Sequence, residues 1–131
     1  MEYSLPKRGP ENSGLAGVCR ELGVTLVAYR PLAMGMLTGK YTPEQPPRGA
    51  RAMMYGRAFL AKLQPLRSVL RHIGEARGKT PSQAAINWLP CKGALPIPGA
   101  KDPAQARENA GAMGWRLTPE ELAELEKAAP R

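Results

Sequence analysis

The sequence predicts an α/β fold in which short parallel strands alternate with amphipathic helices. A nearly continuous apolar, β-branched run covers residues 24–29, which is typical of a strand covered on both faces. Helical patterns with clear start signals lie on both sides of it. The chain has 131 residues, of which 43% are hydrophobic, so we expect one domain, residues 1–131. The alternation implies parallel strands joined by right-handed crossovers.

The first elements surround this run. Residues 1–5 resemble the end of a strand, as though the chain began in mid-fold. A helix is expected next, capped at its start by Asn12 or Ser13 and stopped by Gly23. Four apolar residues fall on one face of this helix: Leu15, Val18, Cys19 and Leu22.

Residues 30–56 are rich in Pro and Gly and predict a long irregular loop, which in a compact domain is usually functional or mobile. A long amphipathic helix then ends at Gly78. Its apolar positions are Leu60, Leu63, Leu66, Val69, Leu70 and Ile73.

Three further helices carry the same start signal. Thr80, Asp102 and Thr118 are each followed by Pro and, three residues on, by Gln or Glu, a pattern of N-cap, Pro at N1 and capping box. Between the first two lies a strand at 94–97, which should be brief because Pro96 cannot donate to a ladder.

About three parallel strands with this much helix leave sheet edges unpaired. A complete (β/α)₈ barrel needs about 250 residues, so half a barrel is the economical interpretation. Open edges and apolar faces favour association. We therefore expect a lone half barrel to self-associate, bind a partner or aggregate.

The net charge is +8, which is compatible with nucleic acid, anionic membranes or phosphorylated ligands. Nucleic acid is disfavoured because the cations are dispersed, aromatic residues make up only 5%, and no nucleic-acid motif is present. The apolar runs are too short to span a membrane. Cys19 and Cys91 form neither a disulfide framework nor a metal-binding pattern, which favours a reducing compartment.

Two segments could carry chemistry. In residues 96–105 a strand ends, Gly99 and Lys101 follow, and a helix begins. Free N–H groups at a helix start bind anions, although an ordinary turn with a surface Lys explains the pattern equally well. Residues 29–41 follow the buried strand, where α/β folds place ligands. That Gly-rich apolar loop could wrap a flat ligand or could merely plug the barrel end.

Together with the surrounding sequence, these segments resemble the aldo-keto reductase family. The order and spacing agree over nearly the whole chain. Residues 87–93 and Gly114-Trp115 look most like the plant, algal and cyanobacterial branch. The matching segments are 2–5, 23–29, 31–33 with Gly35, 37–41, 97–101 and 108–112.

The resemblance implies an NADPH-dependent carbonyl reductase, with this chain as the C-terminal half of a (β/α)₈ TIM barrel. Its partners would be the nicotinamide cofactor and a small carbonyl substrate, in the cytoplasm or the chloroplast stroma. Tyr29 would stack on the nicotinamide, and Lys101 would favour NADPH over NADH. The pyrophosphate side would be lined by Pro31, Leu32, Ala33, Gly35 and Lys40, and the adenosine end by Gly99, Lys101, Gln105, Glu108 and Asn109.

Some positions depart from the family pattern. Arg30 stands where many members have Ser. It either adds charge near the pyrophosphate or is a substitution without functional effect. Many members carry an Arg at the position of Ala104, which weakens the NADPH assignment. Arg107, one turn further on, could compensate, and Arg48 and Arg51 in the long loop could close over the phosphates. Each of the three could instead be an ordinary surface charge.

The family's proton donor Tyr, with its Lys, Asp and His, comes from the N-terminal half of the barrel, and no motif here matches them. His72, the single His, is expected to be a solvated helix residue. The chain alone should therefore be inactive and is expected to hold no metal. The alternatives are a non-catalytic module that binds NADPH or pairs with another half barrel, and a structural remnant without a ligand.

Overall fold

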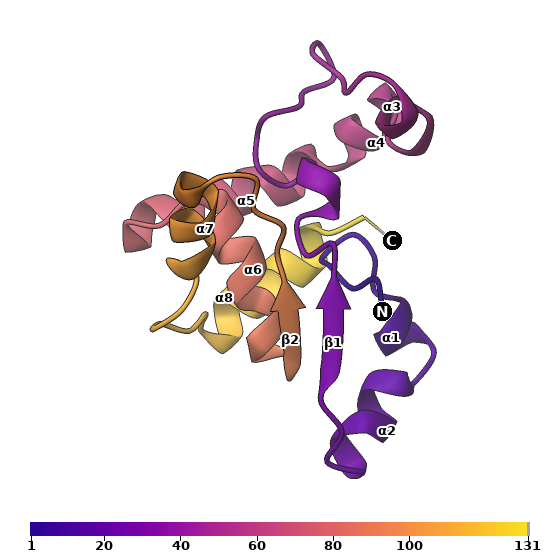
Figure 1. The fold of residues 1–131 in the computed structure, drawn as a ribbon, viewed down its shortest axis with the longest axis vertical. Coiled ribbons are helices and arrows are strands. Elements are labelled where there is room, and N and C mark those ends of the chain that lie inside the picture. The colour runs from indigo at the N-terminus through magenta and orange to yellow at the C-terminus, as the bar shows by residue number, and fades with distance from the viewer. Residues whose placement is uncertain (131) are drawn as a thin grey trace.

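The computed structural model describes residues 1–130. Two parallel strands stand side by side, with α5–α8 on one side of the pair and α1 and α2 beside β1 (Figure 1). No helix within this range is long and apolar enough to cross a membrane. The elements are α1 (Gly9–Asn12), α2 (Leu15–Glu21), β1 (Leu26–Tyr29), the 3₁₀ helix η1 (Ala33–Gly35), α3 (Ala50–Met54), α4 (Arg57–Lys62), α5 (Gln64–Arg77), α6 (Pro81–Cys91), β2 (Ala94–Ile97), α7 (Pro103–Ala110) and α8 (Pro119–Ala128).

The sheet is smaller than the sequence suggested. β1 and β2 pair in parallel, with Leu26 opposite Ala94 and Tyr29 opposite Ile97. The predicted strand at residues 1–5 is reduced to a parallel bridge between Glu2 and Tyr29, in which the Tyr29 N–H donates to the Met1 carbonyl over 2.9 Å. Regular pairing stops after this bridge because the chain turns there, with Ser4 and Lys7 exchanging two backbone hydrogen bonds of 3.1 and 2.9 Å.

The predicted start of the first helix is wrong. Ser13 ends the short α1, and Gly14, in a left-handed conformation with φ of 78°, caps α2 without a side-chain bond. Gly23 does end the helix, with φ of 67°. Val18 and Leu22 of the predicted apolar face are exposed rather than buried.

The predicted long helix is divided into α4 and α5 at Leu63. The cause is Pro65, which lies in the first turn of α5. Pro has no N–H to donate to the preceding turn, and its ring clashes with the carbonyl four residues earlier. Gly78, with φ of 63°, ends α5 as predicted.

The three predicted helix starts are confirmed. Thr80 and Thr118 form complete capping boxes with Gln83 and Glu121. Asp102 accepts from the backbone N–H of Gln105 over 2.8 Å. These signals are local, since the cap, the fixed φ of Pro and the N3 side chain all lie within one turn.

The two faces of the sheet differ. Leu26, Ala28 and Ala94 are buried in the core, which is formed largely by α5, α6 and α8. The opposite face carries exposed apolar side chains, because successive residues of a strand point to opposite sides. These four residues, the open face of the sheet, are Val27, Tyr29, Leu95 and Ile97, with exposed fractions of 41–55%.

Polar interactions fix the connection between α7 and α8. The Asn87 side chain, buried in α6, donates to the carbonyls of Ala112 (2.9 Å) and Trp115 (2.8 Å). It also accepts from the backbone N–H of Leu117 over 3.0 Å. One amide therefore holds the whole irregular segment that precedes α8.

A charged cluster links α1, α6 and α8. Glu11 accepts from the Tyr3 hydroxyl over 2.6 Å and pairs with Arg8 and with Lys92 (3.1 Å). Lys92 also pairs with Glu126 over 2.9 Å. Burial alone would raise the pKa of Glu11, but the hydrogen bonds from Tyr3, Arg8 and Lys92 outweigh it, so the pKa lies below its usual value.

Candidate functional site

A groove of about 850 Å³ opens at the carboxyl ends of β1 and β2, which is the edge of a parallel sheet where α/β folds bind ligands. This volume is in the range of small-ligand sites, roughly 300–1,000 Å³. The groove lies between the loop after β1 and the loop after β2. Its lining residues are Arg30, Pro31, Leu32, Met34, Gly35, Thr38, Gly39, Lys40, Tyr41, Arg51, Ser82, Ile97, Pro98, Gly99, Ala100, Lys101, Gln105, Glu108 and Asn109.

The loop after β1 has an unusual backbone. Arg30, Ala33 and Met34 are in the left-handed region with φ of 56°, 48° and 57°, which non-glycine residues rarely adopt. Gly35, with φ of 93°, lies against Tyr41, whose ring carbon would be 3.5 Å from a Cβ at that position. Such strained segments cluster at ligand-binding sites, because the surrounding structure must hold them in place.

The segment between β2 and α7 forms the opposite lip of the groove. Side chains hold this lip in place by hydrogen bonds to the backbone. The Gln105 side chain accepts from the Lys101 N–H over 2.9 Å, and Asn109 donates to the Gly99 carbonyl over 3.1 Å. Together with the Asp102 cap, these bonds fix the start of α7 relative to β2. The amide groups therefore shape the turn that carries the Lys101 side chain.

The groove is strongly cationic. Arg30, Lys40, Arg51 and Lys101 line it, against the single carboxylate of Glu108. Arg51 is held in place by donating to the Tyr41 hydroxyl over 3.0 Å. Such a groove attracts an anionic ligand and favours one with several phosphates.

Arg30 forms a partly exposed ion pair at the end of β1. Its guanidinium lies 3.7 Å from the Glu2 carboxylate, and Tyr55 is packed close to the same carboxylate. Burial, and then the charge of Glu2, raise the pKa of Tyr55, so its phenol stays protonated. Arg30 is thereby held between β1 and the groove.

The structure brings most of the predicted site residues together. All but Tyr29 and Ala33 line the groove. Ala33 is fully buried under the loop, and Tyr29 stands on the open face of the sheet, opposite Ile97 in the strand register. Of the two arginines expected to close over the phosphates, Arg51 lines the groove and Arg48 does not, and Arg107, weighed as a compensating charge, is exposed outside it. His72 is exposed on α5, as expected.

Sequence reasoning missed several lining residues. Ser82 belongs to α6, where the capping box of Thr80 accounted for the local pattern. Met34, Thr38 and Tyr41 were read only as parts of a loop. The spacing of Tyr41 and Arg51, ten residues apart, carries no periodic signal that could have paired them.

Comparison with known proteins identifies the class of protein. Residues 1–130 match the sequence model of the aldo/keto reductase family, so the chain belongs to this family of oxidoreductases. It is 45% identical over 129 residues to the chloroplastic pyridoxal reductase of Arabidopsis thaliana, covering 98% of this chain and 35% of that protein. It is 35% identical to the NADP(+) aldo-keto reductase yakc of Schizosaccharomyces pombe, covering 96% of this chain and 38% of yakc.

Solved structures agree. The thermostable aldo-keto reductase Tm1743, solved with the inhibitor epalrestat, superposes with a TM-score of 0.73 at 29% identity over 98% of this chain and 38% of that one. The glycerol dehydrogenase AKR11B4 of Gluconobacter oxydans superposes with a TM-score of 0.87 at 23% identity over 97% of this chain and 40% of that one. The chain thus spans about a third of the length of the relatives above. The predicted fold class, the C-terminal half of a (β/α)₈ barrel, is confirmed.

Proposed function

We propose that this chain is the cofactor-binding half of an NADPH-dependent carbonyl reductase. The observation that carries the proposal is the cationic groove at the carboxyl ends of β1 and β2, lined by both segments that the sequence singled out. The relative yakc is named for NADP(+), and the Arabidopsis relative is named for pyridoxal, an aldehyde. The chloroplastic relative also supports a stromal location as an alternative to the cytoplasm.

The residues present fit a dinucleotide phosphate. Lys101 and the fixed lip at the start of α7 would hold the 2′-phosphate and adenosine end, with Gln105, Glu108 and Asn109. Arg30, Lys40 and Arg51 would face the pyrophosphate, next to Pro31, Leu32 and Gly35. Tyr29, exposed beside the groove, would stack on the nicotinamide ring, and Ala33 would support the loop from within. When bound, the nicotinamide supplies the hydride for carbonyl reduction.

Residues 1–130 offer no evident proton donor for that reaction. No His lines the groove, and its one Tyr, Tyr41, lies in the loop after β1 and matches none of the family's catalytic motifs. The Tyr55 phenol is buried. General acid catalysis needs a donor within hydrogen-bond reach of the carbonyl oxygen, so we infer that the acid comes from outside this range.

The first test is turnover by the isolated chain. With NADPH and a small aldehyde, the chain should consume NADPH no faster than a protein-free control, because it binds the cofactor but cannot protonate the product. A rate proportional to protein concentration, and lost in an unfolded sample, would contradict the inference. Failure to bind any nucleotide would instead favour the structural remnant.

The transcript upstream of the Met1 codon separates the half-reductase from the non-catalytic module. A continuous frame that encodes the family's Asp, Tyr, Lys and His motifs would support the reductase. An in-frame stop just before Met1 would favour the module that binds NADPH, or pairs with another half barrel, without catalysis.

The open face of the sheet supports self-association as a second property. Its exposed apolar side chains, and the unpaired ladder groups at the strand edges, favour pairing with another chain. We expect sedimentation to show dimers or larger species that dissociate when Val27 and Leu95 are both replaced by Glu. A wild-type chain that stays a monodisperse monomer over a wide concentration range would contradict this expectation.

A further inference from the structure

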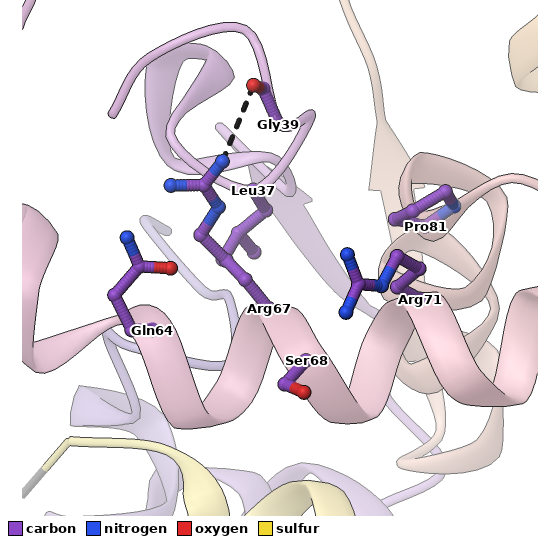
Figure 2. A pocket seen from close by; sticks show the side chains of 7 residues that line it. All are labelled: Leu37, Gly39, Gln64, Arg67, Ser68, Arg71 and Pro81. Atoms are coloured by element: carbon purple, nitrogen blue, oxygen red, sulfur yellow. Dashed lines mark hydrogen bonds between the residues drawn. The ribbon is translucent and has the colours of Figure 1, made fainter. Parts of the chain in front are cut away.

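A second cavity lies apart from the main opening of the cofactor groove, against α5 (Figure 2). Its volume is about 500 Å³. Leu37 and Gly39 of the loop after η1 form one wall, and Pro81 at the start of α6 forms another. Nothing in the proposed dinucleotide site uses the α5 residues that line it.

The α5 side of this cavity is polar and cationic. Because residues three and four apart share a helical face, four lining side chains of α5 stand together. They are Gln64, Arg67, Ser68 and Arg71. Figure 2 shows the Arg67 side chain extending toward Gly39 and the Arg71 guanidinium pointing to the Arg67 side of the cavity, beside Pro81.

Arg67 and Arg71 have hydrogen-bond donors and charge that no other group of the described chain uses. One terminal nitrogen of Arg67, Nη2, donates to the Gly39 carbonyl over 3.2 Å, but the other, Nη1, is buried without a hydrogen-bond partner. Buried donors are nearly always satisfied by protein, water or a ligand. Arg71 is exposed. Within residues 1–130, neither guanidinium has a carboxylate within 4.0 Å.

Within residues 1–130, no carboxylate serves as the counter-ion of these two guanidinium groups. Glu44 is exposed, and its pKa is lowered first by a backbone N–H and the Thr42 hydroxyl, and then by Arg57 and Arg67. Its carboxylate is therefore within electrostatic reach of Arg67 but forms no ion pair with it. Like charges four residues apart on a helix repel each other, so Arg67 and Arg71 together favour an anion with more charge than one carboxylate.

We propose that this cavity binds a phosphate-type oxyanion, either inorganic phosphate or the phosphate of a small phosphomonoester. Arg67 and Arg71 are its cationic ligands, since the guanidinium fork matches the oxygens of phosphate. Gln64 and Ser68 lie on the same face as neutral donors. The site is separate from the 2′-phosphate site at Lys101, although Gly39 lines both cavities.

The test is NMR of the chain labelled with ¹⁵N in its arginine side chains, titrated with inorganic phosphate at constant ionic strength. We expect saturable shifts of the Arg67 and Arg71 Nε–H signals, which persist in the Lys101→Glu background. Arg71→Ala makes a suitable variant because Arg71 has no hydrogen bond to lose, and it should weaken phosphate binding about tenfold. Arg20→Ala, at an exposed position on α2, is the matched control and should change nothing.

A further variant and a second ligand extend the test. Glu44→Gln removes a competing carboxylate and should strengthen phosphate binding. Glycerol 3-phosphate that binds more tightly than inorganic phosphate would assign the site to a phosphomonoester, and the reverse order would assign it to the free ion. The proposal is overturned if the Arg67 and Arg71 signals move no more than that of Arg20, or if chloride produces the same shifts.

Discussion

Replacing Lys101 with glutamate is expected to weaken NADPH binding by about 10- to 150-fold, the range for hydrogen bonds to charged groups. Lys101 stands at the fixed lip between β2 and α7, where the 2′-phosphate is proposed to lie. Gln105 and Asn109 hold this lip through bonds to the backbone of Lys101 and Gly99. The substitution removes a cation and places a carboxylate beside a dianionic phosphate, so the loss should be largest at low ionic strength.

NADH provides the internal control for this variant. It lacks the 2′-phosphate, so its affinity should be nearly the same for wild type and Lys101→Glu. Lys62→Glu, which makes the same charge change at an exposed position outside the groove, should leave NADPH binding unchanged. Titration calorimetry with both nucleotides measures all these affinities. An equal loss for NADPH and NADH would place Lys101 away from the 2′-phosphate.

Asn87→Leu is expected to lower the free energy of unfolding by about 3–4 kcal/mol, since each buried group left unpaired costs about 1–3 kcal/mol. Leucine has nearly the same shape but cannot donate to the carbonyls of Ala112 and Trp115 or accept from the Leu117 N–H. Asn87 is 3% exposed, so water cannot easily replace it. Urea unfolding followed by circular dichroism gives the difference.

The matched control is Asn12→Leu. Asn12 is exposed in α1 and its side chain makes no hydrogen bond, so the change should be within about 0.5 kcal/mol of wild type. If Asn87→Leu were equally mild, the segment between α7 and α8 would not depend on the Asn87 amide.

Local signals account for the parts of the fold that were predicted from sequence. The helix starts at Thr80, Asp102 and Thr118 depend on residues within one turn, and β2 has the predicted bounds 94–97. The regular strand expected at residues 1–5 is not formed, because the chain turns between Ser4 and Lys7 after a single bridge to β1.

The broken long helix and the displaced start of α2 have different origins. Pro65 could have been read as a helix start, since Pro is tolerated in the first turn, but the apolar periodicity continued across it. Gly14 caps α2 through a left-handed backbone, which leaves no side-chain signature. A pattern of apolar residues therefore located the helical region but not its interruptions.

The candidate site was likewise predictable from the sequence only in part. The loop after β2 was singled out because a strand end, a Gly, a Lys and a helix start combine into a recognisable anion site. The left-handed conformations of Arg30, Ala33 and Met34 could not be predicted, because they are non-glycine residues and the surrounding packing holds them. The cavity beside Arg67 and Arg71 was also invisible, since two arginines on a helix usually form a solvated face.

The most direct test of the central claim is ³¹P NMR of NADP⁺ in the presence of this chain. The 2′-phosphate and the two pyrophosphate phosphorus atoms give separate signals, so each end of the groove reports independently. We predict that all three signals shift with saturation and that the pKa of the 2′-phosphate falls, because Lys101 stabilises its dianion. Signals that remain as in free NADP⁺, with the chain shown to be folded, would contradict the assignment of this groove to the cofactor.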